Sequence, residues 1–548
     1  MAQTPDKNTL FYGDNLRILQ DHIADESVDL IYLDPPFNSN ANYNVLFKTP
    51  DGVQSQSQIE AFEDTWHWNI TAEAAYDAVL KSGNSDAANM LAAMRSFLGT
   101  NDMMAYLAMM AVRLLELHRV LKPTGSLYLH CDPTASHYLK LLLDAVFGAD
   151  RVLNEIIWQR STGKALMTRR LPTNHDVLLS FAKGDSWTWN QEELYQRYDP
   201  ENLPAKTAAK YSQVDDDGRI YRLDSLINPN PNRPNLTYEF LGITRVWRWT
   251  RERMERAYAD GVVVQTAAGR VPQMKRYLDE QEGIPISDVW TDIAPLNSQA
   301  QERLGYPTQK PLALLERILA ASSNEGDVVL DPFCGCGTTV HAAQKMGRKW
   351  IGIDVTHLAV GLIKRRLTEA FPMADFQVLG TPQDVAAAQA LADADKHQFQ
   401  LWALSMLDNA VPYKGGKKGA DGGVDGYVFF QVPSEGGAGS KTETGKAIVS
   451  IKGGGVQDSH VKDLITTIDH EKAQMGLFVT LKPPTKPMIT RAAAAGFYQA
   501  GGKSYPRVQI LTIEELFDGK RPHMPWLDPS VFKKAKKEQQ DSGQGSLL

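Results

Sequence analysis

Residues 28–39 read VDLIYLDPPFNS, and the five residues from Leu33 to Phe37 are the most informative of the chain. The apolar run before them, Val28–Leu33, has the length and composition of a buried strand. It stops at a carboxylate and two prolines, and proline removes backbone donors, so neighbouring carbonyls are left without a sheet partner. Ligands of open α/β sheets bind just beyond the carboxyl ends of strands. We therefore expect Asp34 to face a functional crevice, although a Pro-Pro pair can also simply end a strand.

A second strand-and-turn pattern occurs much later, where residues 327–339 read DVVLDPFCGCGTT. A short strand runs there into a turn with Gly335 and Gly337, and a helix follows. The next strand, residues 350–353, ends at Asp354. Glycines let the backbone approach a ligand, and an acid at a strand tip can accept hydrogen bonds from ribose hydroxyls. The pattern predicts a nucleotide-binding βαβ half, although the third glycine of the dinucleotide fingerprint is absent.

The two patterns together resemble the β-class DNA amino-methyltransferases. In that family an Asp-Pro-Pro-Tyr/Phe element comes first, a target-recognition region follows, and a Phe-x-Gly-x-Gly element that binds S-adenosylmethionine comes last. The matching stretches are residues 34–37 and 333–337, supported by Gly13-Asp14, residues 119–131 (RVLKPTGSLYLHC) and residues 308–311 (TQKP). The resemblance covers roughly residues 9–368. It implies an α/β, Rossmann-like S-adenosylmethionine-dependent methyltransferase fold with a circularly permuted motif order.

The resemblance also implies roles for individual residues. The expected catalytic residues are Asp34, Pro35, Pro36 and Phe37. The expected cofactor-binding residues are Asp14, Lys310, Asp331, Phe333, Gly335, Gly337 and Asp354. Hydrogen bonds from an exocyclic amine to Asp34 and to the Pro35 carbonyl would localise the nitrogen lone pair for attack on the sulfonium methyl group. The target base must leave the duplex, and Phe37 can stack on its face.

The aspartate at position 34 favours N6 of adenine, because the cytosine enzymes of the family usually carry serine there. Methylation of cytosine N4 stays an alternative. Methylation of RNA or of a protein amide is disfavoured by Asp34 and by the long insertion between the two motifs. A DNA-binding defence component with a vestigial methyltransferase is a further alternative, against which the intact Asp34, Phe37 and glycine turn count.

The composition agrees with a large globular enzyme. The chain has 548 residues, of which 43% are hydrophobic, and its three cysteines are too few for a disulfide framework. No apolar run has the length of a membrane span and the first residues lack a signal-peptide pattern, so we expect a cytoplasmic protein with no membrane partner. With a formal charge of −7, contact with double-stranded DNA must use a local basic surface. The resemblance suggests a second copy or restriction-modification subunits as protein partners.

The middle of the chain is the expected target-recognition region. Within it, residues 245–256 read RVWRWTRERMER, and interleaved arginines and aromatics suit phosphate contact and stacking. An amphipathic helix with a solvated Arg/Glu face explains the same letters equally well. Trp247 and Trp249 also resemble scaffold positions of these enzymes.

The expected domain organisation has six parts. These are a catalytic methyltransferase half (1–185), a target-recognition region (186–291), a cofactor-binding half (292–379), a linker (380–398), a small α/β nuclease-like domain (399–525) and a disordered tail (526–548).

In the carboxy-terminal domain, Asp425 and Lys452 resemble the site of PD-(D/E)XK nucleases. Acids hold Mg²⁺ in such sites and the lysine orients or activates the attacking water, so Asp425 would be a Mg²⁺ ligand. Ser450 stands where the second acid is usual, and Asp421 or Asp458 would have to replace it. We expect weak or conditional cleavage that depends on Mg²⁺ or Mn²⁺. A DNA-binding module that does not cleave explains the same residues equally well, and an unrelated fold with a glycine-rich turn and a surface lysine is a further alternative.

Overall fold

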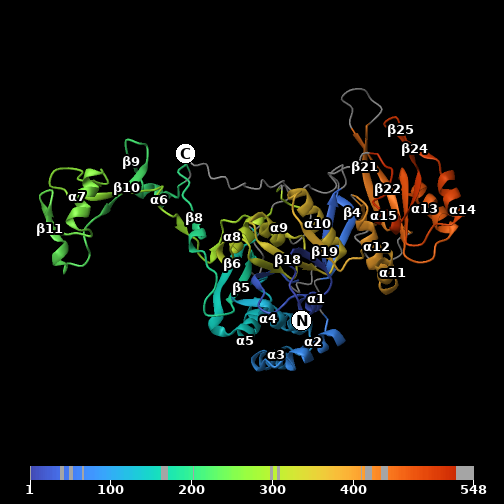
Figure 1. Cartoon of the computed structure of the whole chain (residues 1–548), viewed down its shortest axis with the longest axis horizontal. Coiled ribbons are helices and arrows are strands. Elements are labelled where there is room, and N and C mark those ends of the chain that lie inside the picture. The colour runs from blue at the N-terminus through green and yellow to red at the C-terminus, as the bar shows by residue number, and fades with distance from the viewer. Residues whose placement is uncertain are drawn as a thin grey trace. The chain divides into compact units, whose positions relative to one another are not determined.

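The computed structural model describes residues 2–36, 42–48, 54–63, 67–161, 171–201, 203–296, 300, 302–304, 309–408, 410–413, 423–433 and 442–525. The chain divides into two compact units, one formed by Met1–Trp189 with Asp288–Leu548 and the other by Asn190–Ser287 (Figure 1). Among the described residues, no helix combines the length and the apolar character that crossing a bilayer requires.

The larger unit contains a nine-stranded mixed sheet, built from its described residues. Its spatial order is β16 (Val289–Trp290), β6 (Val152–Gln159), β7 (His175–Ala182), β5 (Leu121–Cys131), β2 (Val28–Leu33), β17 (Val328–Asp331), β18 (Lys349–Asp354), β1 (Asn8–Tyr12) and β19 (Phe376–Leu379). Strand β7 runs antiparallel to β5 and β6, whereas the other neighbouring pairs are parallel. A mixed, mainly parallel sheet with intervening helices agrees with the expected Rossmann-like α/β fold.

Helices follow the strands of this sheet. They are α1 (Asn15–His22), α2 (Ile70–Leu80), α3 (Ser85–Leu98), α4 (Asp102–Val120), α5 (Ser136–Phe147), α8 (Leu312–Ser322), α9 (Thr338–Lys345) and α10 (His357–Ala370); β3 (Asn42–Lys48) and β4 (Gln54–Glu63) form a separate antiparallel pair. Helix α4 is apolar on most of its surface, and its residues are buried in the core together with those of β2 and β5. A helix that is hydrophobic nearly all round must be buried in this way.

Strands β2 and β17 lie side by side although they come from the two halves of the chain, with Leu30 opposite Val329 and Ile31 opposite Leu330. From β2 the sheet continues to β5, and from β17 it continues in the opposite direction to β18. The connections therefore diverge at the carboxyl ends of β2 and β17. Such a switch point leaves a crevice between the strand ends, and ligands of open α/β sheets bind there.

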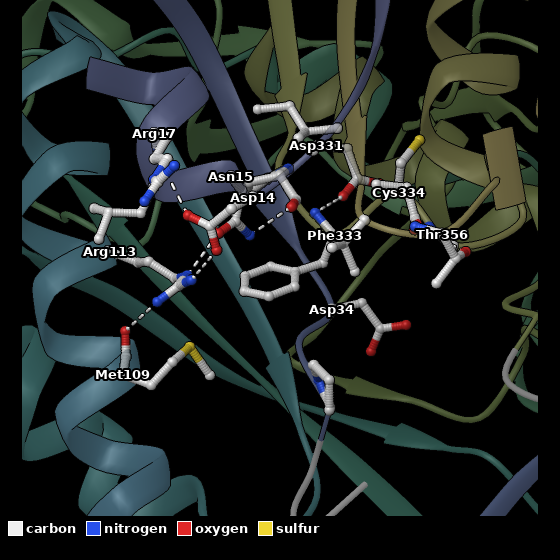
Figure 2. A pocket seen from close by; sticks show the side chains of 18 of the residues that line it. Asp14, Asn15, Arg17, Asp34, Met109, Arg113, Asp331, Phe333, Cys334 and Thr356 are labelled. Atoms are coloured by element: carbon white, nitrogen blue, oxygen red, sulfur yellow. Dashed lines mark hydrogen bonds and ion pairs between the residues drawn. The ribbon is translucent and has the colours of Figure 1, made fainter. Parts of the chain in front are cut away.

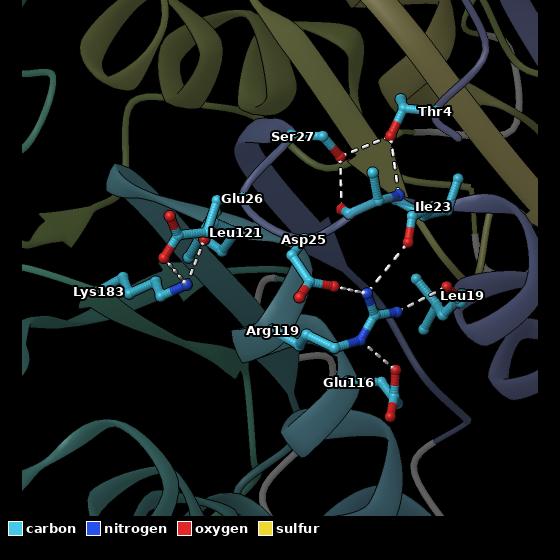
Figure 3. Close-up of polar contacts among 11 residues, drawn as sticks. Thr4, Leu19, Ile23, Asp25, Glu26, Ser27, Glu116, Arg119, Leu121 and Lys183 are labelled. Atoms are coloured by element: carbon cyan, nitrogen blue, oxygen red, sulfur yellow. Dashed lines mark hydrogen bonds and ion pairs between the residues drawn. The ribbon is translucent and has the colours of Figure 1, made fainter. Parts of the chain in front are cut away.

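Arg119, at the end of α4, fastens the segment that leads into β2 (Figure 3). Its guanidinium donates to the carbonyls of Leu19 at 2.7 Å and Ile23 at 3.1 Å, and its Nε donates to Glu116 at 2.8 Å. It also pairs with Asp25. The last carbonyls of a helix lack intrahelical donors, so Arg119 supplies donors at the end of α1 and holds the segment between α1 and β2 in place.

The smaller unit has its own core and short elements. These are β8 (Tyr195–Gln196), α6 (Ala205–Lys210), β9 (Gln213–Val214), β10 (Ile220–Ser225), β11 (Thr237–Phe240), β12 (Ile243–Val246), α7 (Arg251–Ala259), β13 (Val263–Val264), β14 (Gln273–Tyr277) and β15 (Ile284–Pro285). Trp247 is fully buried in this core and donates from Nε1 to the Tyr238 carbonyl at 2.8 Å. Trp247 is thus a scaffold residue.

The carboxy-terminal part of the chain contains a five-stranded sheet in the order β20 (Ala410–Pro412), β21 (Gly426–Pro433), β22 (Thr442–Lys452), β23 (Met475–Thr480) and β26 (Val508–Thr512). Its other elements are α11 (Val385–Ala394), α12 (Lys396–Ser405), α13 (Asp458–His470), α14 (Lys486–Ala494), β24 (Phe497–Ala500), β25 (Lys503–Pro506) and α15 (Ile513–Phe517). Helix α11 falls in the range expected to be a linker, yet Ala388 and Ala392 are buried with Phe399 in the core of this sheet. Their small side chains allow the close packing that makes this helix part of the folded structure.

Candidate active site

A cavity of about 1030 Å³ lies at the carboxyl ends of β2, β17 and β18. It collects most of the residues expected to be functional. The expected residues that line it are Asp14, Asp34, Pro36, Lys310, Asp331, Phe333, Gly335 and Asp354 (Figure 2). Pro35 is buried beside it and Gly337 forms the turn below it, whereas Phe37 lies outside the described residues. The tertiary structure thus brings the two distant motifs to one cavity.

Asp34 follows directly on β2 and is paired with Lys310. The Lys310 ammonium donates to Oδ2 of Asp34 at 2.5 Å, and only 17% of the Asp34 side chain and 10% of the Lys310 side chain are exposed. The second oxygen, Oδ1, is buried and has no hydrogen-bond partner among the residues that the structure describes. An unpaired buried acceptor costs free energy, so Oδ1 is a ready acceptor for a donor brought by a substrate. Lys310, expected to bind cofactor, lines the cavity and contacts Asp34, the residue expected to be catalytic.

Asp354 joins the glycine turn to the start of α10. Its Oδ2 accepts a hydrogen bond from the Gly335 amide at 2.9 Å, and its Oδ1 accepts from the amide and the hydroxyl of Thr356, both at 2.8 Å. Burial raises the pKa of Asp354 to about 6. Each carboxylate oxygen has two lone pairs, so Asp354 can keep these bonds and still accept from a ligand hydroxyl.

The glycine turn depends on its glycines. Gly335 and Gly337 have φ values of 53° and 75°, in the left-handed region that side chains disfavour. A Cβ atom on Gly337 would also lie 2.8 Å from Cγ1 of Ile363. The turn therefore needs glycine for both its conformation and its packing against α10.

Arg366 supports the same turn, and the sequence analysis did not identify it. It is only 3% exposed, and one terminal nitrogen donates to the Cys336 carbonyl at 3.0 Å and to the Thr338 hydroxyl at 3.2 Å. Its Nε donates to His341 at 3.2 Å. No local pattern marks Arg366, because the arginine lies in an ordinary amphipathic helix.

Asp14, Asn15 and Arg113 form a second group that reaches the cavity (Figure 2). Asp14 caps α1 by accepting from the Arg17 amide at 3.2 Å, and it accepts from Arg113 at 2.7 Å. Asn15 accepts from Arg113 at 2.5 Å and donates to the Pro332 carbonyl at 2.8 Å. Arg113 was not predicted, although an arginine in the middle of the apolar helix α4 is a signal that could have indicated it.

The cavity is acidic. Asp331 is 2% exposed and accepts from the Phe333 amide at 3.0 Å. Burial, with smaller contributions from Asp34 and Asp354, raises the pKa of Asp331 to about 7. Lys310 and Arg113 are tied to Asp34 and Asp14, while Asp331 and Asp354 form no ion pair within the described part of the chain. Such a surface favours a cationic ligand.

The nuclease-like residues of the carboxy-terminal domain lie near each other in the backbone. Asp425 directly precedes β21 and accepts from the Ile451 amide at 2.6 Å, one residue before Lys452. Asp458 is instead paired with Arg491, whose Nε donates to it at 2.7 Å. Asp421 lies outside the described residues, and within the described ones no three His, Cys, Asp or Glu side chains are arranged to hold a metal ion. A second carboxylate beside Asp425 is thus not provided by Asp458.

Comparison with known proteins gives a consistent match. The family model described as DNA methylase matches residues 28–365. The type II methyltransferase M.EcaI of Enterobacter cloacae is 27% identical over 398 residues, which cover 72% of this chain and 76% of that protein. The Mod subunit of the type III restriction-modification enzyme StyLTI of Salmonella typhimurium is 25% identical over 365 residues, 64% of this chain and 52% of the subunit. The DNA adenine methyltransferase YhdJ of Escherichia coli is 25% identical over 363 residues, 66% of this chain and 83% of that protein.

Proposed function

Because the chain belongs to the DNA methylase family, we propose that it transfers a methyl group from S-adenosylmethionine to the exocyclic N6 amine of adenine in double-stranded DNA. The single observation that carries the proposal is Oδ1 of Asp34, which is buried and has no hydrogen-bond partner in the described part of the chain, on a residue that lines the cavity. This oxygen is an acceptor close to a turn of the nucleotide-binding kind. A poorly nucleophilic amine needs such an acceptor when its lone pair is drawn toward a methyl donor.

The residues of the cavity fit S-adenosylmethionine. When bound, this cofactor supplies an activated methyl group on a positively charged sulfonium. Asp331 and Asp354 favour a cation, and the glycine turn lets a nucleoside approach the backbone. Asp14, Phe333, Gly335 and Asp354 would hold the cofactor, with Asp354 accepting from the ribose hydroxyls.

In this reaction the two oxygens of Asp34 have different roles. Oδ1 accepts an N–H of the target amine, which localises the nitrogen lone pair, while Oδ2 stays bonded to Lys310. After methyl transfer the nitrogen carries a positive charge and must lose one proton, and Oδ1 can accept it. Lys310 holds Oδ2 in place and so leaves Oδ1 as the oxygen that meets the amine.

Adenine is proposed over cytosine because position 34 is aspartate. The adenine-directed relative YhdJ supports this choice, and cytosine N4 is the alternative. The test is long-read detection of modified bases in DNA from cells that lack other DNA methyltransferases and express this chain. N6-methyladenine in a fixed motif, absent with Asp34→Ala, is the expected result. N4-methylcytosine in a fixed motif would select the alternative, and unmodified DNA would contradict both.

For the carboxy-terminal domain we propose DNA binding without cleavage. One oxygen of Asp425 is occupied by the amide of Ile451, the residue before Lys452. Ser450 is neutral and 4% exposed, and Asp458 is held by Arg491. A Mg²⁺ site of nucleases needs several oxygen ligands, usually carboxylates.

A further inference from the structure

A chain of four polar side chains crosses the sheet next to the cavity. The Tyr32 hydroxyl lies 2.9 Å from Nδ1 of His130, and Nε2 of His130 lies 3.1 Å from Oδ2 of Asp176. The other oxygen of Asp176 lies 3.0 Å from a terminal nitrogen of Arg160. None of these residues was singled out from the sequence, and the function proposed above does not use them.

The four residues lie at the same end of four neighbouring strands, the end where β2, β5 and β6 have their carboxyl ends. Tyr32 and His130 are each one residue from the carboxyl end of their strands, β2 and β5. Asp176 is the second residue of the antiparallel strand β7, and Arg160 directly follows β6. Asp34 and the cavity lie at the same end of the strands. Of the four residues, Tyr32 is the one that lines the cavity.

Stability alone gives little reason for this arrangement. Tyr32, His130 and Asp176 are 2%, 0% and 2% exposed. Replacing buried ion pairs by apolar residues of similar volume is often neutral or stabilising, so buried polar groups are weak evidence for a stabilising role. A hydroxyl that must be held in one direction in the cavity wall is a better explanation.

The protonation states of Asp176 and Tyr32 determine which group donates in each hydrogen bond of this group of residues. Burial alone would raise the pKa of Asp176, but the hydrogen bond from His130 and the charges of Lys310 and Arg160 hold that pKa below its usual value. The Asp176 carboxylate therefore accepts from Nε2–H of His130, an assignment made from the hydrogen-bond network. Nδ1 is then the acceptor for the Tyr32 hydroxyl. Burial, together with the charge of Asp34, raises the pKa of Tyr32 well above its ordinary value, so the hydroxyl keeps its proton.

We propose that Tyr32 is a positioning residue for methyl transfer, which fixes the end of β2 and thereby the direction of Oδ1 of Asp34. The inference rests on the proposed function and deepens it, because it names the residues that orient the catalytic carboxylate. Tyr32 lies two residues before Asp34, and successive side chains of a strand alternate, so both face the same side. Lys310 is shared by the two systems, since it bonds Asp34 and lowers the pKa of Asp176 by its charge.

The first experiment compares Tyr32→Phe with Tyr128→Phe in the full chain. Tyr128 is a matched control because it pairs with Tyr32 across β2 and β5, is 3% exposed and bonds the Ser322 hydroxyl at 2.7 Å, but does not line the cavity. Both variants lose one buried hydroxyl and one hydrogen bond. We expect both to keep a cofactor affinity within about twofold and similar melting temperatures.

Single-turnover methylation at saturating DNA separates the two variants. We expect Tyr32→Phe to be slower by about 10- to 100-fold and Tyr128→Phe to stay within about twofold of the parent, because small misplacements of a reacting group cost such factors. Equal rates in the two variants would overturn the positioning role. The proposed function is tested separately by the parent chain and by Asp34→Ala. A parent chain that methylates no DNA would overturn the proposed function, whereas a slow Tyr32→Phe variant of an active parent supports the positioning role.

A second experiment asks whether Tyr32 acts through its hydrogen-bonded link to His130 and Asp176. Asp176→Asn keeps the volume of the side chain but removes its charge, and Arg160 tolerates the change because its side chain is 38% exposed. If the two residues act as one unit, adding Tyr32→Phe to Asp176→Asn lowers the single-turnover rate by much less than in the parent chain. If the double variant shows the product of the two single-variant fold-changes in rate, Tyr32 and Asp176 act independently and the link is contradicted.

Discussion

The ammonium of Lys310 lies 2.5 Å from Oδ2 of Asp34, although 276 positions separate the two residues along the chain. The bond joins the catalytic element that follows β2 to the segment that precedes α8, and so connects the two halves of the methyltransferase. It leaves Oδ1 of Asp34 as the oxygen available to a substrate. One ion pair therefore holds the Asp34 carboxylate in position and determines which of its oxygens stays available as an acceptor.

The first prediction concerns this pair. Asp34→Ala should lower the rate of methyl transfer by about 10² to 10³, because it removes a charged acceptor that acts in the transition state. Cofactor affinity should change little, since the cofactor is proposed to bind mainly to Gly335, Phe333 and Asp354. A tritiated-methyl assay and calorimetry measure the two quantities. Turnover of the variant at the parent rate would remove Asp34 from the mechanism.

Lys310→Gln is predicted to impair the same step. The substitution removes the ammonium that holds Oδ2 of Asp34, so the carboxylate loses the contact that fixes its direction. Misplacement of a reacting group slows a reaction, so we expect the single-turnover rate to fall by about 10- to 100-fold. Lys310→Arg, which keeps a charged donor, is the control. A rate of Lys310→Gln equal to that of the parent would argue against this role.

Asp354→Ala should weaken S-adenosylmethionine binding by about one to two decades, the loss of a charge-assisted hydrogen bond of about 1.5 to 3 kcal/mol. The same change also frees the Gly335 amide, so a structural effect has to be separated from a lost ligand contact. Thr356→Val is the control, because it removes the hydroxyl bond to Asp354 and keeps the carboxylate. Calorimetry that finds equal affinity in Asp354→Ala and the parent would place the ribose elsewhere.

Asp331 gives a pH-dependent prediction. Its folded-state pKa of about 7 lies above the ordinary value of 3.8, so the folded protein binds more protons than the unfolded chain between these values. The free energy of unfolding contributed by Asp331 is therefore present below about pH 4 and is lost as the pH rises toward 7. Asp331→Asn should flatten this part of the stability profile in chemical denaturation. A profile of the variant that overlays the parent over this range would contradict the prediction.

Binding of a cationic cofactor should lower the raised pKa of Asp331, since a nearby positive charge favours the ionised carboxylate. Protons should therefore be released on binding near pH 6 to 7. Calorimetry in buffers of different ionisation enthalpy measures the number released. Fewer protons should be released by Asp331→Asn than by the parent. Equal release by both proteins would show that Asp331 does not respond to the cofactor.

The unit Asn190–Ser287 is predicted to determine the methylated sequence. On its surface Arg253 lies 4.3 Å from the ring of Trp249 and Arg251 lies 4.9 Å from that of Tyr238, so both guanidinium groups are placed on aromatic faces while their side chains remain exposed. Such groups can contact phosphates and bases. Exchange of this unit for that of a related methyltransferase should transfer the recognition motif, as read by long-read sequencing. An exchanged enzyme that keeps full activity and its original motif would locate specificity elsewhere.

The sequence by itself determined the two elements on which the site is built. A strand that ends in a carboxylate and two prolines, and a glycine turn followed by a strand that ends in Asp354, are local patterns of strand length, proline and glycine, and these act over a few residues.

Only the tertiary structure decided which distant groups meet these elements. The pairing of Lys310 with Asp34, the support of the glycine turn by Arg366 and the chain from Tyr32 to Arg160 join residues from different strands and helices. A buried polar side chain looks in sequence like any exposed one, because its partner is fixed by strand order and register and not by its neighbours along the chain. For the same reason the alanine-rich helix α11 reads as a spacer, while its packing against Phe399 makes it part of a core.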